Sequence, residues 1–176
     1  MATASKIRIV SYQPRFGEAF KALNTEWIEK YFAVEEEDLK ILNDPEGYVV
    51  QTGGEIFFAL TEEDTVVGCA AMILSNGHQN PNDDDDKNGP DYSDKPIFEL
   101  GKMAVAPHMR GKGISKLLMD ACLQFARQEN AQAVCLLTDD SLKAAMALYL
   151  KSGFVRLPRK KDQRYARGDV EMWMTL

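Results

Sequence analysis

Apolar residues recur along this chain with two periods, and each period predicts one kind of element. Alternating positions and short apolar runs predict strands at 7–10, 55–60, 65–74, 97–105, 133–137, 154–156 and 170–176. Apolar residues three or four apart predict amphipathic helices at 16–32, 114–129 and 141–151. An acidic run followed by apolar positions predicts a shorter helix from residue 35. It ends at Asp44-Pro45, because the residue before a proline avoids the α region.

The order of these elements predicts the fold class. Strands 55–60 and 65–74 flank a polar turn and are expected to form an antiparallel hairpin. Strand 97–105, helix 114–129 and strand 133–137 form a strand–helix–strand unit, which implies parallel pairing of its two strands. We therefore expect an α/β fold, with a mixed central β-sheet flanked by helices in a single domain. Residues 75–96, rich in Asp, Asn, Gly and Pro, predict a long exposed loop.

The composition is that of an ordinary globular protein, and it excludes several classes. The chain has 176 residues, of which 45% are hydrophobic and 27% charged, with a net charge of −6. The acidic balance argues against nucleic acid as a partner, and no apolar run is long enough to suggest a membrane. The cysteines, Cys69, Cys122 and Cys135, are odd in number and follow no apolar signal core. We therefore expect reduced, buried thiols and a cytoplasmic location.

The charge is divided unevenly. Residues 1–82 carry a net −7, residues 83–94 a net −5 and residues 95–176 a net +6. The two histidines, His78 and His108, lie far apart, and no Cys or His pair has the spacing of metal ligands, so no metal site is expected.

A glycine-rich turn is the first candidate site. It follows strand 97–105 and reads Arg110-Gly111-Lys112-Gly113-Ile114-Ser115, where the next helix begins. Glycines at such a junction let the backbone approach a ligand, and the helix N-terminus offers unpaired N–H groups that bind phosphate. The turn is neither a P-loop nor a dinucleotide fingerprint. A plain strand-to-helix connection with exposed basic residues remains the alternative.

Two stretches of the sequence carry a family resemblance. Residues 99–107 with Arg110-Gly111-Lys112-Gly113-Ile114 resemble the cofactor motif of the GNAT-type N-acetyltransferase superfamily. Residues 145–154, which end in Leu148-Tyr149-Leu150-Lys151-Ser152-Gly153-Phe154, are similar to a second motif of that superfamily, and residues 167–172 resemble the last strand of one subgroup. The chain departs from the family pattern at His108 and Leu142.

The resemblance implies acetyl-CoA as co-substrate and names the residues that would serve it. The pyrophosphate would lie on the turn and the pantetheine arm along the preceding strand, which implies contacts from Met103, Ala104, Val105, Arg110, Gly111, Lys112, Gly113, Ile114, Ser115 and Tyr149. Tyr149 is the candidate general acid, with rim packing as the alternative. Glu99 is the candidate base, with a solvated strand end as the alternative. Trp27, Tyr31 and Phe32 are candidates for the acceptor pocket, although aromatic residues at helical spacing also suit a core.

The implied activity is acetyl transfer to a primary amine. The acidic loop would narrow the entrance and favour a small or amino-acid-like acceptor, and the acidic N-terminal half suits a cationic amine. The alternatives are a protein N-terminal or lysine acetyltransferase and a non-catalytic CoA-binding sensor. We expect a single domain over 1–176, with the acceptor side mainly in 1–74, the loop at 75–96 and the acetyl-CoA core in 97–154. A monomer or homodimer is expected.

Overall fold

The computed structural model describes residues 6–75, 94–157, 165–168 and 170–176. Most of the polar loop predicted at 75–96 lies outside these ranges. Within them, no helix combines the length and the apolar character needed to cross a bilayer.

The described residues form one mixed sheet of seven strands in the order β1-β2-β3-β4-β5-β7-β6. The strands are β1 (Arg8–Ser11), β2 (Glu55–Leu60), β3 (Val66–Leu74), β4 (Ile97–Val105), β5 (Ala133–Thr138), β6 (Val155–Arg156) and β7 (Val170–Thr175). Strands β2 and β3 form the predicted antiparallel hairpin, and β4 and β5 form the predicted parallel pair. The remaining neighbours are antiparallel, so the mixed α/β class is confirmed.

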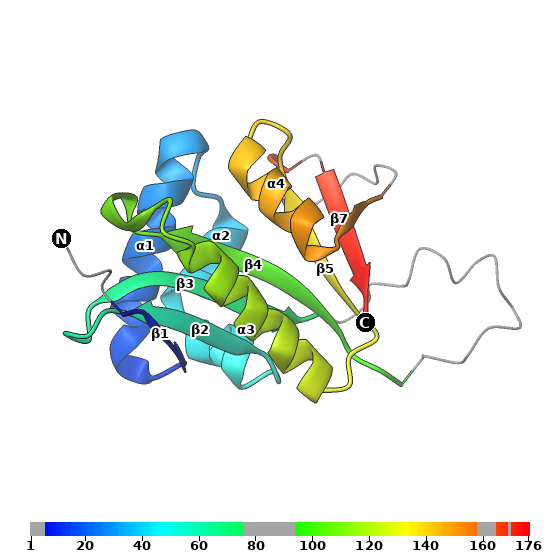
Figure 1. Ribbon diagram of the computed structural model, residues 1–176, viewed down its shortest axis with the longest axis horizontal. Coiled ribbons are helices and arrows are strands. Elements are labelled where there is room, and N and C mark those ends of the chain that lie inside the picture. The colour runs from blue at the N-terminus through cyan, green and yellow to red at the C-terminus, as the bar shows by residue number, and fades with distance from the viewer. Residues whose placement is uncertain (1–5, 76–93, 158–164, 169) are drawn as a thin grey trace, which may run out of the picture.

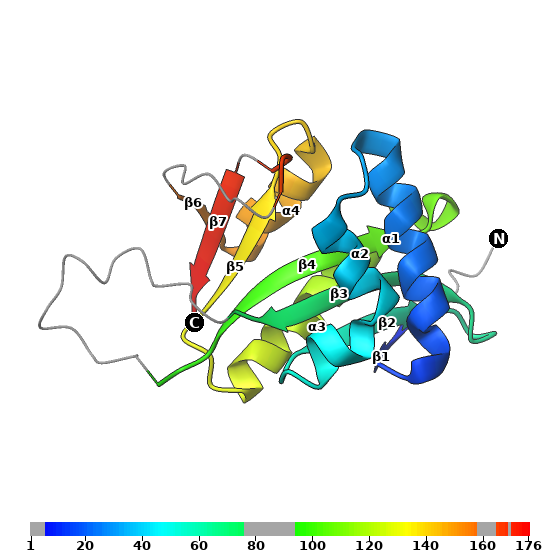
Figure 2. The same ribbon diagram turned by 180° about the vertical axis from the view of Figure 1, so that it is seen from behind.

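Helices cover both faces of the sheet. Helices α1 (Gly17–Tyr31) and α2 (Glu36–Asn43) lie on the face seen in Figure 2, whereas α3 (Ile114–Gln128) and α4 (Lys143–Ser152) lie on the face seen in Figure 1. Phe20 of α1 packs against Phe58 of β2, with ring centroids 6.2 Å apart, and α3 buries Leu118 and Cys122 on the opposite face. Cys69, Cys122 and Cys135 are all buried and free, as expected.

The sequence pattern did not predict all of the local structure. Helix α2 ends before Asp44-Pro45 as predicted, but a π-helical turn (Glu46–Val50) that was not predicted follows Pro45 directly. The Asp44 side chain accepts a hydrogen bond from the Gly47 amide at 2.9 Å and so holds the start of that turn. Helix α4 begins later than predicted, because Ser141 is held outside it by Asp139, whose carboxylate accepts from the Ser141 amide at 2.9 Å. Short 3₁₀ turns at Pro14–Phe16 and Pro107–Met109 were also not predicted.

Strand β4 runs beside β3 for its whole length but leaves β5 early. The β4–β5 register covers only Ile97, Phe98 and Glu99, and beyond Glu99 the two strands diverge, as Figure 2 shows. The β3–β4 register shifts between Cys69 and Ala71, so that two residues of β4 stand opposite one residue of β3. Lys102 occupies this bulge with φ of +51°, a left-handed conformation that is strained for a residue with a side chain.

A buried cluster of charges surrounds the bulge. Lys102 Nζ and Arg167 Nη2 each donate to Asp38 Oδ1 at 2.7 Å, and the Asp38 side chain is completely buried. Arg167 also donates to Glu35 at 2.9 Å. The Asp38 carboxylate accepts from the Glu35 amide at 2.9 Å and thereby caps α2. One carboxylate therefore joins α2, the bulge of β4 and the segment before β7.

The pKa of Asp38 shows that hydrogen bonds and nearby positive charge outweigh the effect of burial. Burial alone would raise the pKa of this carboxyl, but hydrogen bonds from Arg167 and Lys102, together with the charge of Lys102, hold it below its ordinary value. Asp38 is therefore ionised at neutral pH, and its two cations compensate its charge.

The substitution Asp38→Asn tests this cluster. It removes one charge and leaves the buried Lys102 ammonium without a counter-ion, so we expect the free energy of unfolding to fall by about 3 kcal/mol. Urea denaturation followed by circular dichroism measures the change. Glu37→Gln is the matched control, because Glu37 lies on the same helix and its ion pair within the described residues is with the exposed Lys40. A loss no larger for Asp38→Asn than for Glu37→Gln would show that the cluster does not hold the fold together.

The same variant has a signature in acid. Because the folded-state pKa of Asp38 lies below the unfolded-state value, its contribution to stability is complete above about pH 4 and is lost as the pH falls through the folded-state pKa. Between about pH 4 and pH 2, the unfolding free energy of the unaltered chain should therefore decline more steeply with pH than that of Asp38→Asn. Equal slopes would contradict the lowered pKa.

Candidate active site

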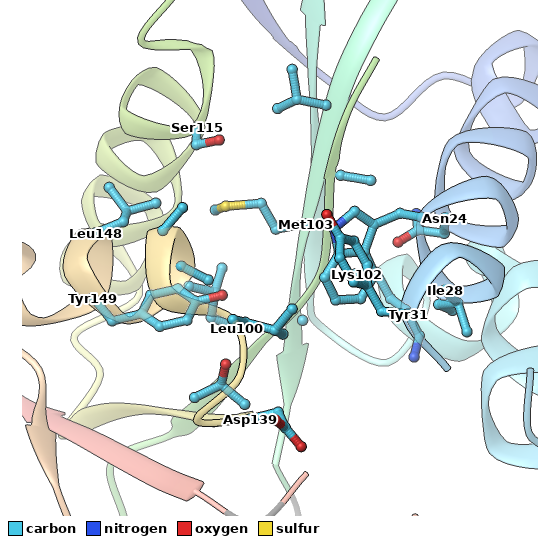
Figure 3. A pocket seen from close by; sticks show the side chains of 18 of the residues that line it. Asn24, Ile28, Tyr31, Leu100, Lys102, Met103, Ser115, Asp139, Leu148 and Tyr149 are labelled. Carbon is cyan, nitrogen blue, oxygen red and sulfur yellow. The ribbon is translucent and has the colours of Figure 1, made fainter. Parts of the chain in front are cut away.

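A cavity of about 810 Å³ opens where β4 separates from β5. Its walls are formed by α1, β4, the turn before α3, the end of β5 with the loop that follows it, α4 and the segment 165–168. Figure 3 shows Ser115 and Tyr149 on one side of it and Asn24 and Lys102 on the other. The strand-to-helix turn and the first helix, far apart in sequence, thus border one continuous space.

The glycine turn forms one end of this cavity. Gly111 and Gly113 have φ of +75° and +79°, which are left-handed values that favour glycine. No described atom comes within 4 Å of the place where a Cβ would stand on either residue. The first amides of α3 have no partner within the helix, and no side chain caps it. This end therefore has the room, the N–H donors and the positive helix dipole that suit a phosphate group.

Most of the predicted cofactor-binding residues border the cavity. The set that does so is Met103, Ala104, Val105, Arg110, Gly111, Gly113, Ile114, Ser115 and Tyr149. Lys112 is not among the residues that line it. Its ammonium donates to the sulfur of Met109 at 3.4 Å. The Arg110 side chain donates to the Val105 carbonyl at 3.1 Å, which ties the turn to the end of β4.

Both predicted catalytic residues border the same space. Tyr149 of α4 directs its hydroxyl into the cavity (Figure 3), while its ring packs edge-on against Phe154 at 6.1 Å. Burial raises the pKa of Tyr149 to about 12, so this phenol keeps its proton at physiological pH. Glu99 is the last residue of β4 that pairs with β5 and is 9% exposed, so it is not a solvated strand end. A proton donor and a carboxylate are therefore available at the point where the strands part.

The opposite end of the cavity is aromatic. Trp27, Tyr31 and Phe32 line it, and their rings pack on one another with centroids 5.5 to 6.3 Å apart. The sequence therefore identified residues of this wall, and the structure brings them into the same cavity as the glycine turn.

Sequence reasoning missed four polar residues at this end: Asn24, Lys102, Tyr165 and Arg167. Asn24 carried a usable signal in the sequence, because it interrupts the apolar face of a predicted helix. The structure buries it, with 1% of the residue exposed. The two cations carried none, since their partners lie 64 and 129 residues away in the chain. Of the two departures from the family pattern, Leu142 lines the cavity and His108 lies exposed in a 3₁₀ turn.

Cys69 lies close to this end but does not have the character of a nucleophile. It is completely buried, and burial raises the pKa of its thiol to about 12. A thiol in this environment is not ionised at neutral pH, and only the thiolate attacks. Covalent catalysis through Cys69 is therefore not supported by its surroundings.

Comparison with known proteins agrees with this architecture. The model of the acetyltransferase (GNAT) family matches residues 18–154. N-acetylaspartate synthetase of Danio rerio is 33% identical over 119 residues, which cover 68% of this chain and 36% of that protein. N-acetyltransferase 8B of Homo sapiens is 33% identical over 114 residues, 65% of this chain and 44% of that protein. The matching part of the chain thus covers less than half the length of each of these curated relatives.

Solved structures show the same fold. An acetyltransferase of the GNAT family from Staphylococcus aureus superposes with a TM-score of 0.76 at 19% identity, covering 97% of this chain and 99% of that one. An acetyltransferase from Streptococcus agalactiae gives a TM-score of 0.74 at 21% identity, covering 97% and 98%. At these identities the likeness shows the fold alone.

Proposed function

We propose that this chain, which belongs to the acetyltransferase (GNAT) family, transfers the acetyl group of acetyl-CoA to a primary amine of a small or amino-acid-like acceptor. The observation that carries the proposal is the single cavity that joins the glycine turn to the aromatic end past Tyr149 and Glu99. A phosphate-bearing donor and an amine acceptor entering from opposite ends would meet between these two side chains.

The donor end suits CoA in its chemistry. The amides from Arg110 to Ser115 would hold the pyrophosphate, in the space that Gly111 and Gly113 leave open. The edge of β4 at 103–105, which β5 does not cover, offers backbone groups to the amides of a pantetheine arm. When bound, acetyl-CoA supplies a thioester whose carbonyl carbon accepts the amine and whose sulfur leaves.

The chain's own residues move two protons. Glu99 accepts a proton from the acceptor's ammonium, whose ordinary pKa is near 10, so that the nitrogen has a free lone pair. The new C–N bond forms as the C–S bond breaks. Tyr149 donates its hydroxyl proton to the departing sulfur and regains a proton as the acylated nitrogen loses its second one, while Glu99 releases the first proton to solvent. The products are an N-acetylated amine and a free thiol, with no net redox change.

The relatives support the choice of acceptor class. The name N-acetylaspartate synthetase denotes an enzyme whose product is an acetylated amino acid. This chain is similar to that enzyme over 119 residues. On that basis we propose an amino-acid-like acceptor for this chain.

A thiol-release assay tests the function directly. The purified chain is mixed with acetyl-CoA and a panel of small amines, amino acids and peptides, and free CoA is followed with a disulfide reagent. The chain's three buried thiols contribute little to this signal. Turnover on small amines is expected. Turnover on peptides alone would contradict the small acceptor, and CoA binding without any turnover would support a sensor instead.

The variant Tyr149→Phe tests the general acid. It keeps the ring that packs on Phe154 and removes only the proton donor, so kcat should fall by about 10²-fold or more while the Kd for CoA stays unchanged. Because the pKa of Tyr149 is about 12, its ionisation should not limit kcat of the unaltered chain at any pH below about 11. Unchanged kcat in Tyr149→Phe would remove the residue from the mechanism.

The variant Glu99→Gln tests the base. It keeps a side chain of the same size and removes the proton acceptor, so we expect kcat/KM at pH 7 to fall by about 10²-fold or more. The deficit should shrink as the pH rises toward the acceptor's own pKa near 10, because the free amine then needs no base. A deficit that stays constant over this range would indicate that Glu99 has a structural role only.

A further inference from the structure

The aromatic end of the cavity, where we place the acceptor, already holds a carboxylate of the protein itself. Lys102 Nζ and Arg167 Nη2 converge on one oxygen of Asp38, both at 2.7 Å. The side chains of the two cations are 9% and 17% exposed, and both residues line the cavity. Two fixed cations with little solvent around them recognise a carboxylate more strongly than surface lysines would.

These cations have donor capacity left over. Lysine and arginine carry eight N–H bonds between them. Within the described residues, the two side chains donate five hydrogen bonds. Asp38 accepts two of them, and Tyr165, Ala33 and Glu35 accept one each. N–H bonds therefore remain for a ligand on side chains that border the cavity.

The nearby aromatic rings are already engaged with these cations. Lys102 Nζ lies 5.2 Å from the ring centroid of Tyr165, and the Arg167 guanidinium lies 5.0 Å from Tyr165 and 5.7 Å from Phe32. An aromatic cage for a cationic substituent needs open ring faces. Here the faces of Tyr165 and Phe32 stack on the protein's own charges, which favours an anionic group beside them.

Asn24 supplies a hydrogen-bond acceptor on the same side of the cavity as Lys102 (Figure 3). Its amide nitrogen donates to the Phe20 carbonyl at 2.9 Å and to Cys69 Sγ at 3.3 Å. The Phe20 carbonyl can only accept, so the orientation of the amide is fixed and Oδ1 is directed toward the cavity (Figure 3). No described residue donates to this oxygen, although Asn24 is 1% exposed. Because this oxygen is not fully enclosed and Asn24 lines the cavity, it can accept a hydrogen bond from an N–H of a ligand bound there.

We propose that the acceptor is an amino acid, that Lys102 and Arg167 bind its carboxylate, and that Asn24 Oδ1 accepts from its amino group. This inference rests on the proposed acetyl transfer and names the acceptor's second functional group. Lys102 and Arg167 are then specificity residues, and Glu99 remains the group that takes the proton.

The first test uses the unaltered chain. A panel of L-amino acids is compared with the corresponding α-carboxamides, which keep the amine and lose the anionic charge. We expect kcat/KM to favour the acids by about tenfold or more, mainly through KM. Equal kcat/KM for acids and amides would overturn the carboxylate subsite while leaving acetyl transfer intact. No turnover on any amine would instead overturn the proposed function.

Variants then assign the residues. Arg167→Gln should raise KM for the acids about tenfold or more and leave KM for their amides and for acetyl-CoA unchanged, and Arg167→Lys should recover part of the loss. The double variant Asp38→Asn/Lys102→Gln removes both charges of one pair, which avoids an unpaired buried ion, and should show the same selective loss. Lys40→Gln is the control, because Lys40 pairs on the exposed face of α2. Equal losses toward acids and amides would show that the cations are structural only.

Discussion

The early separation of β4 from β5 is the constraint on which the site depends. Strands in one sheet normally satisfy each other's backbone groups, and here the β4–β5 register covers only Ile97, Phe98 and Glu99. From Leu100 onward, the edge of β4 faces a cavity instead of a neighbouring strand. Polar backbone, a carboxylate at the last paired position and the turn to α3 are thereby aligned along one wall. The fold thus leaves a row of hydrogen-bonding groups that a ligand completes.

The charge cluster holds this wall in its unusual shape. A strained residue such as Lys102 persists only where the surroundings over-determine its conformation. Its ammonium is anchored to Asp38, whose second oxygen caps α2, and Arg167 fastens the segment before β7 to the same carboxylate. A buried ion pair contributes little net stability compared with an apolar contact, but it fixes geometry. Its role here is to determine where the bulge, α2 and residues 165–168 stand relative to one another.

The parts of the fold and site that the sequence predicted are local. The spacing of hydrophobic residues predicted the strands and the main helices. The glycine turn and Tyr149 became candidates because each belongs to a short contiguous pattern. The π-helical turn after Pro45 was missed, because nothing in a single-residue preference distinguishes it from a loop. Asp38 belongs to the acidic run that begins a predicted helix, and nothing in that pattern shows that it is the most buried carboxylate of the described chain. Its two partners are distant in sequence, so only the folded chain reveals that it is paired.

The division of charge along the chain also shows that a sequence does not reveal which distant residues pair. The acidic N-terminal segment suggested a negative acceptor side suited to a cation, whereas the structure pairs Glu35 and Asp38 with Lys102 and Arg167 from the basic segment. The charges of Glu35, Asp38, Lys102 and Arg167 cancel at the aromatic end of the cavity, so the net charge of a segment does not give the potential at the site. What an incoming molecule meets there is the remaining set of N–H donors and one amide oxygen. Such a surface can bind a carboxylate through N–H donors that lie in fixed positions, and the net charge of a sequence segment does not reveal those positions.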